Sequence, residues 1–174
     1  SACAQLSACL TLAEQWAGVS QEPAAVPCME ESVLSFLRSC EVLTSDWKQM
    51  LEQAANAPEP ENLLAYTPAL DQEIRLFTMD MLYRYYLRAA YAETPEAEIL
   101  PLQMAAFSVC VVLLYSRRLG FHTAEQRLRI WQLFVKEIEY DENNLEELEW
   151  QLETNAAFSP AAFRAYFASP GGVQ

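Results

Sequence analysis

Glycine is scarce in this 174-residue chain, which has only four, two of them in the C-terminal run SPGGVQ. β-Hairpins depend on Gly or Asn-Gly turns, and no such turn separates alternating segments here. The chain also lacks a glycine-rich phosphate loop and a G-x-S-x-G nucleophile motif. Its single histidine, His122, precedes an expected helix start, where a structural or solvated role is the common one. These absences argue against a β-rich fold and against several common enzyme classes.

Basic side chains are few as well. Eleven Lys and Arg face 24 Asp and Glu, for a formal net charge of −13. Nucleic-acid-binding proteins gain affinity by placing Lys and Arg on phosphates, so we expect no nucleic-acid partner. Anionic membrane surfaces repel such a chain too. A protein partner with a basic region is favoured electrostatically.

The cysteines lack the clustering of a metal site. The chain has Cys3, Cys9, Cys28, Cys40 and Cys110, with no C-x-x-C pair. Zinc and iron–sulfur sites normally show close pairs, so we interpret these residues as mostly reduced, apolar packing residues of a cytoplasmic protein. No basic region precedes SACAQLSACLTLA, which argues against a secretory signal.

One uncharged stretch, ILPLQMAAFSVCVVLLYS at 99–116, reaches the lower length limit of a spanning helix. Pro101, Gln103 and Ser108 dilute it, and the rest of the chain is amphipathic. A central helix packed on all sides has the same composition. We therefore favour a buried helix over a membrane span.

What the sequence does contain is helical periodicity throughout, so we predict an all-α fold, a compact bundle of seven or eight helices. Start and stop residues mark the ends of these helices: Gly18 and Gly120 as stops, Ser45 and Ser159 as N-caps, and the capping box TAEQ from Thr123. The expected helices cover 2–17, 29–42, 45–55, 62–92 with a break at Pro68, the apolar stretch to Leu119, 123–140, 142–153 and the segment after Pro160. We divide the chain into N-terminal helices (1–57), which can pack with the rest, a C-terminal helical core (58–168) and a flexible tail (169–174), with NAPEPEN as the linker.

Two faces of these helices stand out. In the long helix, apolar residues recur at spacings of three and four, at Leu76, Met79, Tyr83, Tyr86 and Ala90. On another face Asp80, Arg84 and Arg88 are four apart, a spacing that permits ion pairs. In the 123–140 helix an apolar arc is expected from Leu128, Trp131, Phe134, Val135 and Ile138.

The run KEIEYDENNLEELEW at 136–150 is the most acidic part of the chain. Glu137 and Glu139 fall on opposite margins of the apolar arc, and Asp141 is placed as an N-cap. We interpret the run mainly as a solvated helical hairpin with one or two salt bridges to Arg84 or Arg88. A di-iron site would need Glu-x-x-His pairs, and the chain has none.

The same segments carry a resemblance to a known family. LYRYYLRAAY at 82–91, followed by FVKEIEYDENNLEEL at 134–148, resembles the C-terminal half of flagellin lysine-N-methylases. FLRSCEVLTSDWKQML at 36–51 is similar to a Leu-rich segment of that family that ends in a tryptophan. The likeness spans about residues 33–150 in order. One departure is Tyr140, which stands where the family usually has histidine.

The resemblance implies a bacterial, cytoplasmic protein connected with lysine methylation of flagellin. The family uses S-adenosylmethionine, and its N-terminal half carries a cysteine-rich iron–sulfur or other metal centre that this chain lacks. The chain alone is therefore not expected to be a competent methyltransferase. Its expected role is to recognise the substrate protein, flagellin, or to support the catalytic half. An acidic surface including Glu142 could steer a lysine towards such a site.

The candidate residues for substrate contact or helix pairing, from periodicity and from the resemblance together, form one set: Arg84, Arg88, Glu137, Glu139, Tyr140 and Asn144. No catalytic or metal-ligating residue is assigned. The alternative is a stand-alone helical interaction module with no link to methylation.

Overall fold

The computed structural model describes residues 1–18, 28–58, 64–91 and 94–168. Within these ranges the chain is helical, without strands, and has eight α-helices, one π-helix and one 3₁₀-helix. The linker NAPEPEN lies partly, and the tail 169–174 wholly, outside the described residues. The elements are α1 (Ala2–Ala17), α2 (Met29–Ser39), α3 (Ser45–Asn56), α4 (Pro68–Ala90), α5 (Pro95–Leu119), α6 (Ala124–Phe134), η1 (Val135–Glu139), α7 (Glu142–Thr154), η2 (Ala156–Phe158) and α8 (Pro160–Ala168).

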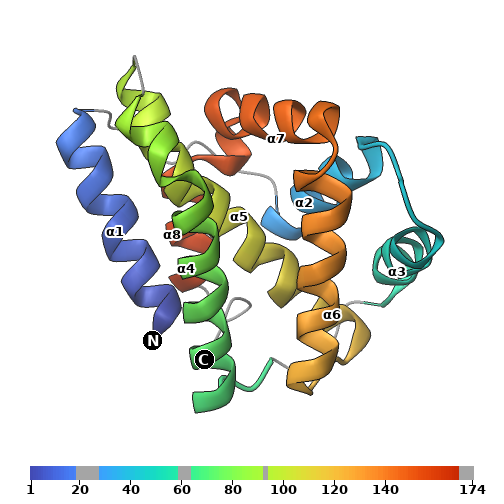
Figure 1. Ribbon diagram of the computed structural model, residues 1–174. Helices are drawn as coiled ribbons and strands as arrows, with labels where there is room; N and C mark the ends of the chain where they lie inside the picture. Colours follow the sequence, from blue (N-terminus) through green and yellow to red (C-terminus); the bar gives the residue numbers. More distant parts are fainter. Residues whose placement is uncertain (19–27, 59–63, 92–93, 169–174) are drawn as a thin grey trace.

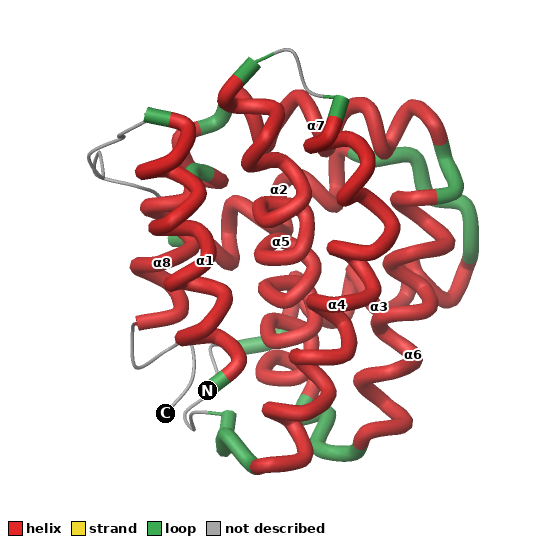
Figure 2. Tube along the Cα trace, turned by 60° about the vertical axis from the view of Figure 1, so that its left-hand side comes forward, coloured by secondary structure: helices red, strands yellow, loops and turns green. Residues whose placement is uncertain are grey.

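Helix α5 lies at the centre of the bundle, and the other helices surround it (Figures 1 and 2). Its residues 104–116 are almost completely buried. By length and hydropathy Ala97–Leu119 could cross a membrane, with a mean hydropathy of 2.0, but 83% of that apolar window is buried inside the protein. The uncharged stretch thus forms the core of the bundle, because seven amphipathic helices each need an apolar surface to cover.

The helix ends are set by local hydrogen bonds that the sequence signals. Gly18 and Gly120 end α1 and α5 with positive φ angles of 68° and 64°, a conformation that side chains with a Cβ rarely adopt. Thr123 and Gln126 form a complete capping box at the start of α6. The hydroxyl of Ser159 accepts from the backbone N–H of Ala162, as an N-cap.

Three expected boundaries are wrong. Thr44, and not Ser45, caps α3, because its hydroxyl accepts from the Trp47 N–H at 3.3 Å. Helix α2 ends at Ser39, ahead of residue 42. The long helix begins only at Pro68, where Thr67 caps it through the N–H of Leu70; proline at the first position has no N–H to satisfy.

The helix expected to run to Tyr140 changes character at Phe134 and continues as the π-helix η1. The expected apolar arc is buried except at Leu128, which is 46% exposed. Helix α6 packs against α4 and α5 and buries Ile130 and Leu133 as well, so its inward face is turned away from Leu128. The π-helix η1, called the π-turn below, is a helical turn wider than that of an α-helix. Single π-turns of this kind occur often at functional sites.

Candidate functional site

The acidic run does not form one solvated face. The π-turn sends Glu137 towards the start of α3 and Glu139 towards α4, and both carboxylates are buried. Further on, Glu142 and Glu146 are exposed on α7. The run therefore contributes two internal carboxylates and an acidic outer surface.

Glu137 is fully buried and accepts hydrogen bonds at the N-terminal end of α3. Its Oε2 accepts from the backbone N–H of Leu43 at 2.7 Å and of Thr44 at 3.4 Å. The Thr44 hydroxyl donates to Oε1 and itself accepts from Trp47. A carboxylate is favoured there because the first N–H groups of a helix carry partial positive charge. The contact fixes α3 to the π-turn.

Asn144 binds the backbone of Glu41, shortly before the residues that Glu137 contacts. Its amide group donates to the carbonyls of Glu41 and Glu137 at 2.8 Å each, and its oxygen accepts from the N–H of Glu41 at 2.8 Å. The N–H of Asn144 donates to Asp141, the N-cap of α7. The side chain thus joins segments about a hundred residues apart. Both Glu137 and Asn144 have their polar atoms engaged within the chain.

Glu139 pairs with the arginine-bearing helix. Its Oε2 accepts from Arg84 Nη1 at 3.2 Å and from the Tyr85 hydroxyl at 3.1 Å. Arg84 also binds Asp80 at 3.1 Å, one turn earlier on α4. Arg88 lies in α4 as expected, but its side chain is outside the described part of the chain. Arg84 and Glu139 are thus brought together, as the helix-pairing hypothesis requires.

The second oxygen of Glu139, Oε1, is buried without a hydrogen-bond partner. Burial raises the pKa of Glu139 above its usual range, although the Arg84 guanidinium opposes the shift. The folded state therefore binds a proton more tightly than the unfolded one. Stability from this group is present below the unfolded pKa and is lost as pH rises through the raised folded pKa.

We expect Glu139→Gln to change the free energy of unfolding at neutral pH by no more than about 1 kcal/mol, because the amide keeps an acceptor for Arg84 without a buried charge. The free energy of unfolding of the variant minus that of the parent should therefore increase as the pH rises from 5 to 7.5. Urea unfolding at the two pH values measures this. A loss above about 2 kcal/mol at pH 7.5 would show that a charged carboxylate is needed there. Glu142→Gln, on the exposed start of α7, is the matched control.

Tyr140 follows the π-turn and is 74% exposed. Its backbone N–H donates to the Val135 carbonyl at 3.2 Å, the bond that closes the wide turn. The ring thus stands on the surface, one residue after Glu139.

The cysteines do not fit an iron–sulfur or other multidentate centre. No group of three His, Cys, Asp or Glu side chains that could hold a metal occurs among the described residues. Burial raises the pKa of Cys3 to about 11 and of Cys40 to about 12, and it raises the pKa of Cys110 as well. Since metals bind the thiolate, burial works against ligation. Cys9 and Cys28 are exposed.

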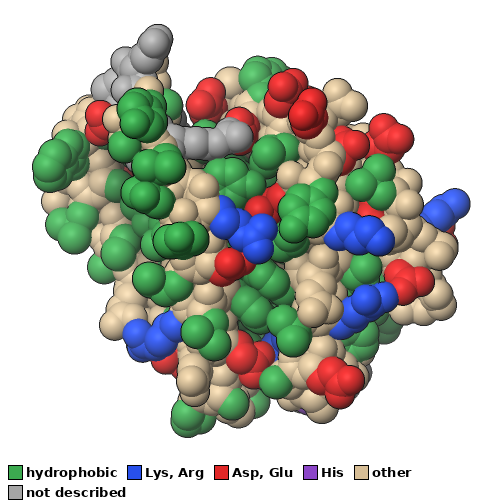
Figure 3. All heavy atoms as spheres, in the orientation of Figure 1, with side chains coloured by type: hydrophobic (Ala, Val, Ile, Leu, Met, Phe, Trp, Pro, Cys, Tyr) green, Lys and Arg blue, Asp and Glu red, His purple; other side chains and the backbone are tan. Residues whose placement is uncertain are grey.

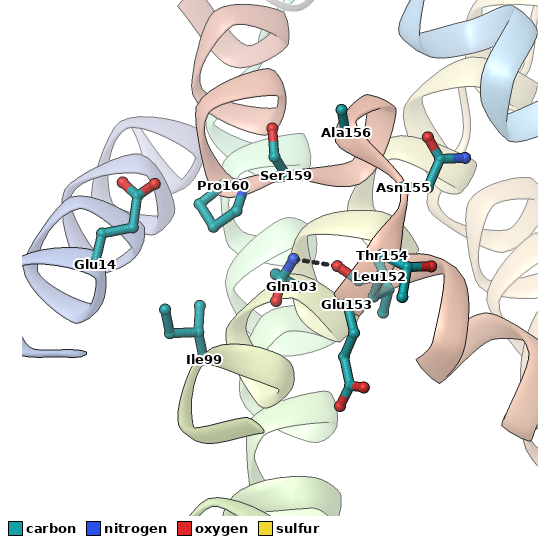
Figure 4. A pocket seen from close by; sticks show the side chains of 10 residues that line it. All are labelled: Glu14, Ile99, Gln103, Leu152, Glu153, Thr154, Asn155, Ala156, Ser159 and Pro160. Atoms are coloured by element: carbon teal, nitrogen blue, oxygen red, sulfur yellow. Dashed lines mark hydrogen bonds between the residues drawn. The ribbon is translucent and has the colours of Figure 1, made fainter. Parts of the chain in front are cut away.

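A small polar cavity lies between α1, α5 and the α7–α8 connection (Figure 4). Gln103 from α5 donates across it to the carbonyls of Leu152 and Phe158, at 2.7 and 3.1 Å. Glu14 lines the opposite side and forms an ion pair with Arg164. The volume is about 140 Å³, below the ~300–1,000 Å³ of typical small-molecule sites. We assign no S-adenosylmethionine site to it.

The largest unexpected feature is an uncovered apolar surface on α1 and α4. Helix α4 buries one apolar stripe, comprising Leu70, Ile74, Phe77, Met81 and Tyr85, but exposes a second on its opposite side. We define the α1–α4 face by its exposed members, Leu12, Trp16, Leu76, Met79, Tyr83, Tyr86 and Leu87. In Figure 3 hydrophobic side chains gather over α1 and α4, whereas acidic ones gather over α7. The apolar stripe of α4 that is most regular in the sequence is thus exposed and does not belong to the core.

The size of this face sets it apart from ordinary surface. Each of its side chains is between 50% and 84% exposed. With ~150–250 Å² for a large aromatic side chain, the total is on the order of 800 Å². The largest apolar patch of a typical monomer is about 300–600 Å², and one side of a standard protein interface is ~800 Å².

The chain matches no protein-family model, no curated protein and no solved structure.

Proposed function

We propose that this chain is a protein-docking helical domain of a flagellin lysine-N-methylase-like protein, and that its α1–α4 face packs against that protein's cysteine-rich catalytic half. The observation that carries the proposal is the uncovered α1–α4 face. The family assignment rests on the resemblance at 33–150.

A permanent protein partner fits this face better than a transient substrate does. Obligate interfaces resemble a domain core cut in two and are more apolar than transient ones. The exposed stripe of α4 is as apolar as the buried stripe on its other side. Transient recognition of a lysine-bearing substrate would depend on exposed carboxylates, and Glu142 and Glu146 lie elsewhere, on α7.

The local charge of α4 supports a close contact. Residues 68–90 contain three acidic and three basic side chains and are neutral, in a chain of net charge −13. A partner that docks on α4 therefore meets less like-charge repulsion than on other surfaces. We assign the exposed α7 carboxylates, Glu142 and Glu146, to the secondary role of attracting basic substrates.

The test mixes the purified chain with the cysteine-rich half of a flagellin lysine-N-methylase and follows complex formation by sedimentation velocity. We expect a one-to-one complex of micromolar or tighter affinity, lost on Tyr83→Arg. Leu128→Arg is the control, since Leu128 is an exposed apolar residue on α6 that lines neither hollow of α1 and α4.

Three outcomes would overturn the proposal. One is the absence of a complex at micromolar concentrations, the result that a stand-alone interaction module predicts. Another is binding of flagellin itself to the face. The third is a dimer of this chain that Tyr83→Arg dissolves, which would make a second copy the occupant.

A further inference from the structure

The α1–α4 face is hollowed rather than flat. Helices α1 and α4 lie side by side and run in the same direction (Figures 1 and 2), tied at their N-terminal ends by hydrogen bonds from Ala2 N–H to Asp71 and from Arg75 to Gln5. Helix α4 packs more extensively against α5 than against α1. Two hollows form a groove along α1 on the side of α4.

Two hollows occupy this groove. The first, of about 290 Å³, is lined mainly by Gln5, Leu6 and Cys9 of α1 and by Met79 and Leu82 of α4. The second, of about 530 Å³, lies farther along and is lined by Leu12, Ala13 and Trp16 of α1, by Ala90 at the end of α4, and by Glu98 and Ile99 of α5. Both linings are mostly apolar.

The spacing of the hollows matches one repeat of an α-helix. On α1 the first hollow centres near residue 5 or 6 and the second near residue 13 or 14. Seven to eight residues of a helix rise about 11–12 Å, close to two turns. A partner helix laid along the groove would place side chains i and i+7 into the two hollows, the pattern of helix-in-groove recognition.

We propose that the groove between α1 and α4 binds one amphipathic helix of the partner protein, with large apolar side chains seven residues apart in the two hollows. This inference rests on the proposed function and specifies its occupant.

The experiment uses two synthetic helical peptides of identical composition, with lysines on the polar face. One carries leucines seven residues apart and the other five apart. The Trp150→Phe background removes the exposed tryptophan on α7, so that Trp16, 84% exposed at the rim of the second hollow, reports binding by a blue shift. We expect the seven-spaced peptide to bind at least about 10-fold more tightly, because one well-buried leucine contributes roughly that much.

Variants separate the groove from the rest of the face. Leu12→Arg and Cys9→Tyr change exposed groove residues and should each weaken peptide and partner binding about 10-fold or more, whereas Leu128→Arg should change neither. Equal affinity of the two peptides, or unchanged binding in both groove variants, would overturn the inference. Should Tyr83→Arg alone then abolish binding of the cysteine-rich half, docking on α4 stands and only the helix-in-groove mode fails. If no variant affects that binding, the proposed function fails too.

Discussion

Glu137→Ala should lower the free energy of unfolding by about 3–4 kcal/mol, because several buried donors lose a charged acceptor at once. The N–H groups of Leu43 and Thr44 and the Thr44 hydroxyl all donate to this carboxylate. Water does not reach the side chain, which is completely buried. The truncation also leaves a space that the packed surroundings can only partly fill.

The measurement is urea unfolding of the purified chain followed by far-ultraviolet circular dichroism. Hydrogen exchange should locate the loss in the first turn of α3, since the capping hydroxyl of Thr44 loses its own acceptor. Glu137→Gln should cost about half as much, because one oxygen remains to accept. Glu142→Ala is the control and should stay within about 0.5 kcal/mol. A cost below about 1 kcal/mol for Glu137→Ala would contradict this account of α3.

The loss of stability expected for Glu137→Ala affects how variants in the acidic run at 136–150 should be interpreted. The sequence identifies Glu137 and Asn144 as residues to test, and the structure gives each a full set of partners within the chain. Loss of activity in a variant of either residue would therefore need a stability measurement beside it. Exposed Tyr140 can be changed with less effect on the fold.

The sequence predicts the fold class and most helix ends because these depend on local chemistry. A positive φ angle at Gly18 or Gly120, and the capping box from Thr123, involve residues within a few positions of one another. Burial of α5 also follows from composition, since thirteen consecutive residues without a charge, 104–116, need surrounding helices.

The parts that the sequence does not predict depend on contacts between distant segments. The π-turn accommodates two carboxylates that bind opposite neighbours, α3 and α4, and neither contact is visible in local periodicity. Helix α4 has apolar stripes on both sides, and periodicity alone cannot say which one α5 covers. The regular spacing of Leu76, Met79 and Tyr83 marks the exposed side. A pattern can therefore indicate a partner as readily as a core.

Glu30→Ala should have an effect on stability at least as large as that of Glu137→Ala, about 3–5 kcal/mol, because it removes a buried carboxylate that binds two largely buried arginines. Glu30 is 2% exposed in the first turn of α2. Its carboxylate binds Arg117 at 2.5 Å and Arg118 at 3.4 Å, and it accepts from the Tyr166 hydroxyl at 3.3 Å. The group thus ties α2 to α5 and α8.

The neighbouring Glu31 provides a matched control. It binds Arg118 at 2.7 Å, yet its side chain is 62% exposed, and exposed ion pairs contribute only about 0–1 kcal/mol. Glu31→Ala should therefore lower the free energy of unfolding, measured with urea, by no more than about 1 kcal/mol. Arg118 also donates to the Ala54 carbonyl at the end of α3, so loss of Glu30 should loosen both α2 and α3. If Glu30→Ala and Glu31→Ala changed the free energy of unfolding equally, water or rearranged side chains would have to compensate for the lost buried carboxylate. The ends of α2 and α5 would then be less tightly packed than their burial indicates.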